Sequence, residues 1–241
     1  MGDKKSFENL MMAAIIFTGI LLIFNQVQLS AISSSLNPGT GAASKVSTFF
    51  GSGSKKTDLS GVDVSEITST AMAIATLFPE LSDIKNDQDA ISMMIPTGTP
   101  EYSEALGGIT FDDPVTSMEY LAKWYSTLNS EIKQDNPEIW QRYLNLAAEP
   151  RGISCEFCCG VGPAGITKEG RSKCGCKHNP AVLALTQGLM KNTDYSDAQI
   201  LKEALKWKSM WFPRNMVGLA MEVAGTDPSQ LKELPGMVGG C

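Results

Sequence analysis

The pattern of apolar and polar positions divides the chain into three parts. Residues 10–32 form a largely apolar run in which no charged residue occurs. Residues 33–61 are rich in Ser, Gly and Thr and show almost no apolar periodicity. From residue 62 onward, apolar residues recur with helical spacing. Because Ser- and Gly-rich stretches act as flexible linkers, we expect one folded domain over 62–241 that a linker joins to an N-terminal segment.

The folded part is predicted to be all-α, with strands no longer than short pieces near the cysteines. Several Asx-Pro pairs precede apolar-periodic runs, and an N-cap residue before proline is a typical helix start. These pairs are Asp113-Pro114, Asn136-Pro137, Asn179-Pro180 and Asp227-Pro228. Two further stretches match a capping box, namely Thr116-x-x-Glu119 and Ser196-x-x-Gln199. We expect helices at about 65–78, 87–95, 114–131, 137–148, 180–191, 196–212, 214–224 and 228–234.

The N-terminal segment has the pattern of a membrane anchor. A helix that spans a bilayer needs about 20 predominantly apolar residues, which residues 10–32 supply. Lys4 and Lys5 precede this run, so the positive-inside rule makes residues 1–9 a cytoplasmic tip and the domain extracytoplasmic. A cleaved signal peptide is the alternative, but Leu29-Ser30-Ala31 lacks the small residue expected before the cleavage site. We therefore expect a single-pass protein of the cell membrane that contacts lipid through residues 10–32.

Charge and histidine content narrow the functional classes. The formal net charge is −6, and Lys and Arg do not gather into a basic stripe, which argues against nucleic acid as a partner. The chain has only one histidine, His178, and it stands within a group of cysteines. Triad-type hydrolysis needs a histidine beside a nucleophile and a carboxylate, so the sequence favours a binding module over an enzyme.

Residues 155–178 carry five of the six cysteines and this histidine. Cys155 and Cys158 form a C-x2-C pair, a spacing that lets one tight turn direct two thiolates at one ion. Cys174, Cys176 and His178 follow at every second position. On an extended segment these three side chains would share one face. The sequence therefore predicts a cysteine-rich loop, inserted between two helices, that gathers soft metal ligands.

A metal centre is the first interpretation of this loop. Four thiolates, or three thiolates and one imidazole, complete a tetrahedral shell for zinc. The predicted metal ligands are Cys155, Cys158, Cys174, Cys176 and His178, with Cys159 as an additional candidate. The second half is C-x-C where paired zinc knuckles have C-x2-C, which leaves copper or an iron–sulfur cluster open. Such a module would be structural or would deliver metal to a protein partner.

Two other interpretations of the cysteines stay open. Two disulfides from Cys155 and Cys158 to Cys174 and Cys176 would staple the loop without metal, and extracytoplasmic thiols tend to oxidise. Either pair could instead serve as the dithiol of a thiol–disulfide oxidoreductase. The G-x-G-x-x-G stretch at 160–165 is not read as a dinucleotide fingerprint, because no strand precedes it. Its glycines are expected to permit tight turns.

The motifs CEFCCG (155–160), CGCKH (174–178) and YSDAQILKEALKWKSMWFP (195–213) carry a resemblance. Together they resemble uncharacterised archaeal membrane-anchored proteins with CE[FY]CCG and CGCxH stretches, over roughly Thr97 to Pro213. That resemblance implies membrane anchoring and no defined activity. The cysteine pair and following helix are also similar, more weakly, to PCYCGC-motif proteins and to accessory proteins of cytochrome c maturation. This second resemblance implies extracytoplasmic handling of metal or thiols.

Overall fold

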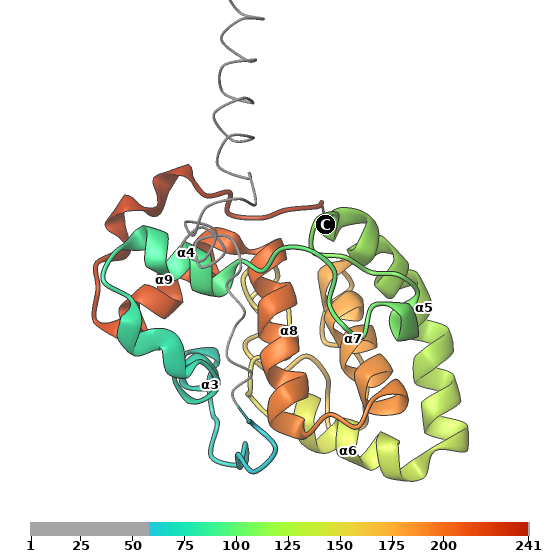
Figure 1. Cartoon of the computed structure of the whole chain (residues 1–241). Coiled ribbons are helices and arrows are strands. Elements are labelled where there is room, and N and C mark those ends of the chain that lie inside the picture. Colours follow the sequence, from blue (N-terminus) through green and yellow to red (C-terminus); the bar gives the residue numbers. More distant parts are fainter. Residues whose placement is uncertain (1–57, 241) are drawn as a thin grey trace, which may run out of the picture. The chain divides into compact units, whose positions relative to one another are not determined.

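The computed structural model describes residues 58–240, which belong to one of two units of the chain (Figure 1). The expected membrane anchor at 10–32 and most of the expected linker lie outside the described residues. The folded part begins before the predicted residue 62, because Leu59 is buried and its carbonyl accepts a hydrogen bond from the Ser196 hydroxyl (3.2 Å).

The mainly helical prediction is confirmed for the described part of the chain. The α-helices are α3 (Thr70–Leu77), α4 (Asp87–Met94), α5 (Pro114–Asp135), α6 (Pro137–Ala147), α7 (His178–Asn192), α8 (Asp197–Trp211) and α9 (Pro213–Ala224). The 3₁₀ turns are η1 (Pro79–Asp83), η2 (Glu104–Leu106) and η3 (Pro228–Glu233). Residues 58–240 contain no strand, only isolated bridges between Ile153 and Ala164 and between Ile166 and Ser172. Both bridges lie in the cysteine loop.

Helix α8 is the central element of these packed helices. It contacts α7 and α5 on one side and α3 and α9 on the other, as Figure 1 shows. Helices α5 and α7 pack against each other along their lengths, and Gly188 permits this because a Cβ there would come within 3.0 Å of the Trp124 ring. The cysteine loop, residues 148–177, connects α6 to α7. It is therefore attached directly to the most buried part of the molecule.

The core is formed by α7 and α8. Helix α7 is buried over almost its whole length, as its nearly uniform apolar sequence predicts. Trp207 and Trp211 of α8 are 0% and 1% exposed, and Met216 and Met221 of α9 are also buried, so all four are core residues. Helix α8 is not the amphipathic cover that its charges suggest. It is buried on most sides and includes Lys208, a lysine that is 1% exposed.

Helix starts show where local sequence rules hold. The Asp113 side chain caps α5 by accepting from the Thr116 N–H (3.1 Å), so Thr116 lies inside the helix and is not its cap. Ser196 and Gln199 form the predicted capping box at α8. The Asn136 side chain does not cap α6, although Pro137 is the first residue of that helix, as predicted. Helix α3 starts five positions later than expected, because Ser69 provides its N-cap.

The prediction for Asn179 was wrong. Helix α7 begins at His178, so Asn179 is its second residue and not its N-cap. Pro180 is tolerated there because the first four N–H groups of a helix have no partner within the helix. The side chain of Asn179 is used elsewhere, in the cysteine loop.

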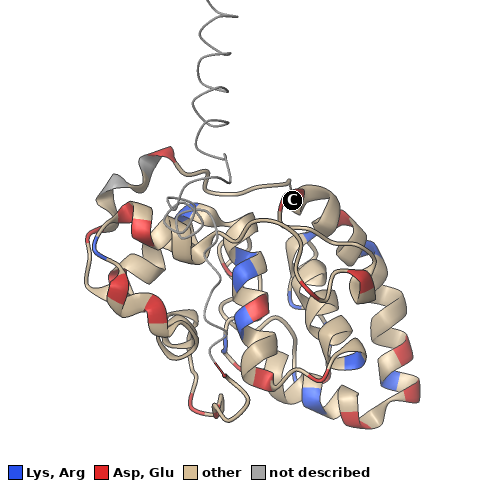
Figure 2. Cartoon of the chain, viewed as in Figure 1, with Lys and Arg blue, Asp and Glu red and all other residues tan. Residues whose placement is uncertain are grey.

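Charges of both signs are interspersed over the described helices. Figure 2 shows Lys or Arg alongside Asp or Glu on α5 and on α8. Among residues 58–240, every helix is too short or too polar to cross a membrane.

Candidate metal centre

The cysteine loop is folded by backbone hydrogen bonds to itself and to α6. The N–H of Gly165 donates to the Ala147 carbonyl (3.1 Å), which ties the loop to the end of α6. The N–H of Lys173 donates to the Gly165 carbonyl (2.9 Å), and the N–H of Gly152 donates to the Pro163 carbonyl (2.8 Å). These bonds fold the segment back on itself, so its two cysteine-bearing ends lie close together.

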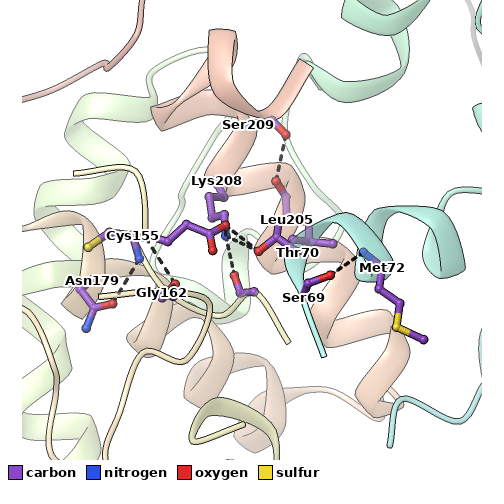
Figure 3. A network of polar contacts seen from close by, with 12 residues as sticks. Ser69, Thr70, Met72, Cys155, Gly162, Asn179, Leu205, Lys208 and Ser209 are labelled. Carbon is purple, nitrogen blue, oxygen red and sulfur yellow. Dashed lines mark hydrogen bonds and ion pairs between the residues drawn. The ribbon is translucent and has the colours of Figure 1, made fainter. Parts of the chain in front are cut away.

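Asn179 holds both halves of the loop at the start of α7. Its Oδ1 accepts from the backbone N–H of Cys155 (3.3 Å), while its Nδ2 donates to the carbonyl of Gly165 (3.0 Å) and to Oγ of Ser172 (2.8 Å). Asn179 is 0% exposed, so it satisfies groups that water does not reach. Figure 3 shows it beside Cys155.

A buried ion pair fixes the residue next to Cys155. The Lys208 ammonium donates to the Glu156 carboxylate (2.7 Å), to the Gly152 carbonyl (2.8 Å) and to Thr70 Oγ1 (3.2 Å). Burial lowers the pKa of Lys208, and the carboxylate of Glu156 opposes that shift. Figure 3 shows this network linking α8, α3 and the loop. The Glu156 carboxylate therefore takes part in a structural ion pair with Lys208.

The cysteine sulfurs converge at one place. Sγ of Cys176 lies 3.4 Å from Sγ of Cys155 and 3.3 Å from Sγ of Cys174. Sγ of Cys159 lies 3.7 Å from Sγ of Cys158, and it is at disulfide distance from Sγ of Cys174. A tetrahedral zinc site with Zn–S bonds near 2.3 Å has sulfurs about 3.8 Å apart. The separations of Cys176 from Cys155 and from Cys174 are therefore close to what one ion requires, whereas Cys159 and Cys174 lie closer, at the distance of a disulfide, and bind an ion only when reduced.

Two groups of ligand atoms meet the requirement that all members lie within 4.8 Å of one another. The first group contains Cys155, Cys159, Cys174 and Cys176, and the second contains Cys158, Cys176 and His178. Each predicted ligand thus belongs to one of two groups, which share Cys176. However, Cys159 is the residue that joins Cys155 in the group of four, while Cys158 lies with His178. This cluster can bind a metal ion.

The turn that follows Cys155 explains why Cys159, and not Cys158, joins Cys155 in the group of four. The N–H of Cys158 donates to the Cys155 carbonyl (2.9 Å), as a tight turn in a C-x2-C pair requires. The side chain one residue further on, at the exposed position of Cys159, reaches Cys174. Gly160 and Gly162 then adopt positive φ values of 65° and 72°, which confirms their predicted role in tight turns.

His178 is packed in the core at the first position of α7. It is 0% exposed, and its ring lies 4.8 Å from the Phe212 ring centre. Its Nε2 lies 2.9 Å from the Val238 carbonyl oxygen. A carbonyl only accepts hydrogen bonds, so Nε2 carries the proton in the neutral ring. Nδ1 then has the lone pair, and it is buried with no hydrogen-bond partner among the described residues.

The sulfurs of Cys155 and Cys176 lie within hydrogen-bond distance of each other (3.4 Å). Their hydrogen bond lowers the pKa of Cys176, and the neighbouring His178 acts in the same direction. The same bond, together with burial, raises the pKa of Cys155. The negative charge therefore resides on Cys176, the more exposed of the two sulfurs. A cavity of about 390 Å³, lined by Cys176 with Glu119, Lys123, Lys177 and Pro180, opens beside it.

The sequence did not reveal the roles of three residues that support the site, namely Lys208, Asn179 and Val238. Lys208 follows Leu201, Ala204 and Leu205 at helical spacing, a signal that places it on the buried face. Asn179 carries no signal, because an Asx-Pro pair also predicts a cap. Val238 acts through its carbonyl, which a side-chain pattern does not reveal.

No family model matches the chain, and neither a curated protein nor a solved structure is significantly similar to it.

Proposed function

We propose that this protein is a metal-binding module in which Cys155, Cys159, Cys174 and Cys176 hold one soft metal ion, with zinc the best fit. The convergence of four sulfurs within 4.8 Å of one another is the observation that supports this function. Thiolate sets of this kind select zinc, Cu(I) or iron–sulfur clusters over hard cations. The d electrons of zinc impose no preferred geometry, and four thiolates bind zinc in many structural sites.

The exposure of the ligands favours metal transfer over a sealed structural site. Cys155 and Cys174 are buried, at 1% and 8% exposure, whereas Cys159 is exposed and Cys176 lines an open cavity. A partner protein's thiolate can therefore approach the ion from the Cys159–Cys176 side and replace one ligand at a time. The apolar run at 10–32 and the lysines before it support the further proposal that this module is tethered to the outer face of a cell membrane.

Metal content of the full chain, purified under reducing conditions, tests the proposal. Elemental analysis is expected to find bound zinc. Replacement of zinc by Co(II) is expected to give the strong thiolate-to-metal charge-transfer absorption of a four-sulfur site. Cys155→Ser should abolish this signature. Cys241→Ser is the matched control, since Cys241 lies outside the cluster segment 155–178. Failure of the reduced wild-type chain to take up zinc, Co(II) or Cu(I) would overturn the proposal.

A thiol–disulfide oxidoreductase is the second candidate. The structure pairs exposed Cys159 with buried Cys174, and Sγ of Cys176 lies 3.3 Å from Sγ of Cys174. A thiolate of a dithiol substrate would attack Cys159 Sγ and release Cys174 as a thiolate. The second substrate thiol would then release Cys159, leaving a substrate disulfide and two reduced cysteines. Oxidation of one equivalent of a dithiol substrate by the oxidised chain, which Cys159→Ser abolishes, would support this candidate; zinc binding without such oxidation would reject it.

A further inference from the structure

A second group of ligands remains after the four thiolates of the proposed site are assigned. Cys158 and His178 lie with Cys176 in a group whose ligand atoms are within 4.8 Å of one another. Cys176 belongs to both groups. A thiolate sulfur has several lone pairs, so it can bind two ions at once.

The orientation of His178 matches that of a metal ligand. Metal-bound histidines almost always donate their other ring N–H to a carboxylate, a backbone carbonyl or water. Here the Val238 carbonyl accepts from Nε2 at 2.9 Å, which fixes the tautomer. The remaining nitrogen, Nδ1, is buried with no hydrogen-bond partner among residues 58–240. A buried polar atom without a partner is uncommon, and an ion held on this nitrogen accounts for it.

The charge of the cluster also favours a second cation. As metal ligands the five cysteines would all be thiolates with five negative charges, of which one divalent ion offsets two. The only lysine of α8 that is fully buried, Lys208, is already paired with Glu156. A second divalent ion would offset two further charges, and bound cations are often the largest local charges in such a site.

We propose, as an extension that rests on the proposed function, that the loop holds a dinuclear centre in which the Cys176 thiolate bridges two ions. The first ion is bound by Cys155, Cys159, Cys174 and Cys176. The second is bound by Cys158, Cys176 and Nδ1 of His178, which leaves one coordination position for water or for an incoming ligand. Three protein ligands and an open position distinguish exchangeable or reactive zinc from closed structural zinc.

Titration of the reduced, metal-free full chain with cadmium-113 tests this arrangement on the unaltered protein. The spectrum is expected to show two resonances, one in the range of four sulfur ligands and one shifted by the nitrogen ligand. Scalar coupling between them would identify the shared sulfur. Native mass spectrometry of the same sample is expected to show about two ions per chain.

Two variants separate the ions. His178→Gln and Cys158→Ser should each lower the metal content from about two ions to about one and leave the four-sulfur resonance in place. Circular dichroism spectra check that each variant is folded, and the cadmium spectrum of the wild-type chain does not depend on them. A wild-type chain with a single four-sulfur ion, unchanged in both variants, would overturn the dinuclear centre alone. Absence of any bound ion in the wild-type chain would overturn the proposed function as well.

Discussion

The ammonium of Lys208 lies 2.7 Å from the carboxylate of Glu156, and this buried pair joins the last turn of α8 to the residue after Cys155. The two side chains are 1% and 14% exposed. An ion pair at such depth contributes little net stability when intact, because desolvation of both charges offsets their attraction. Loss of one partner is costly, since the other charge is left buried.

Lys208→Met is therefore expected to destabilise the protein by about 3–5 kcal/mol. The double variant Lys208→Met with Glu156→Gln should recover part of this loss, because it removes both charges. Denaturant unfolding of the wild-type chain, of the single variants Lys208→Met and Glu156→Gln, and of the double variant, arranged as a double-mutant cycle, measures the coupling. Lys206→Met is the matched control, since Lys206 lies on the same helix and its pair with Glu203 is partly exposed (29% and 13%); there we expect about 0–1 kcal/mol. Equal losses for Lys206→Met and Lys208→Met would contradict the role given to the buried pair.

Much of the fold follows from local sequence. The capping box at Ser196 and the Asp113-Pro114 start are set within a few residues, so the helices after them were predicted closely. The loop was also predictable, because five cysteines and the only histidine fall within 155–178. The structure adds the exact partners, which depend on how distant segments meet.

The choice between Cys158 and Cys159 shows why the sequence alone does not identify these partners. Both positions are compatible with a metal site, and the C-x2-C spacing favours Cys158. Which sulfur faces Cys174 depends on the direction of the chain after the turn, and that is set by glycines at positive φ and by contacts with α7. The Asn179 side chain makes those contacts. No pattern within the loop reveals it, because two of its three partners are backbone groups, 24 and 14 residues away in the sequence.

Asn179→Ala is expected to destabilise the loop strongly. The substitution leaves the Cys155 N–H and the Gly165 carbonyl buried without their partner, and each such group costs about 1–3 kcal/mol. We expect a loss of roughly 3 kcal/mol in the free energy of unfolding, with weaker zinc binding. Asn192→Ala is the control at the other end of α7, where the side chain bonds only to the Gly188 carbonyl (2.9 Å). Wild-type stability and zinc affinity in Asn179→Ala would show that Asn179 does not hold the two halves of the loop together.

Neighbouring serine substitutions should have different effects on the cluster. Cys159→Ser removes a ligand of the four-thiolate group, whereas Cys158→Ser leaves that group complete. Cys159→Ser is therefore expected to lower zinc affinity by at least tenfold and to abolish the four-sulfur Co(II) spectrum. Cys158→Ser should preserve the spectrum. Competition titrations with a chromophoric zinc chelator measure both affinities. The reverse order, with Cys158→Ser the more damaging, would restore the C-x2-C pairing expected from the sequence.

Removal of the metal should loosen the loop before it affects the helices. Binding free energy at a thiolate site contributes to folding, and residues 148–177 have no regular strand or helix of their own. Hydrogen exchange of the reduced chain, before and after treatment with a strong chelator, should therefore show faster exchange in the loop and unchanged protection in α5 and α8. Exchange at Cys155 and Lys173 is the sharpest readout, because their N–H groups bond to Asn179 and Gly165 within the folded loop. Chelation that left loop exchange unchanged would show that the hydrogen bonds alone hold the sulfurs together. Readdition of zinc to the chelated sample should restore protection, and magnesium should not, because thiolates bind soft ions over hard ones.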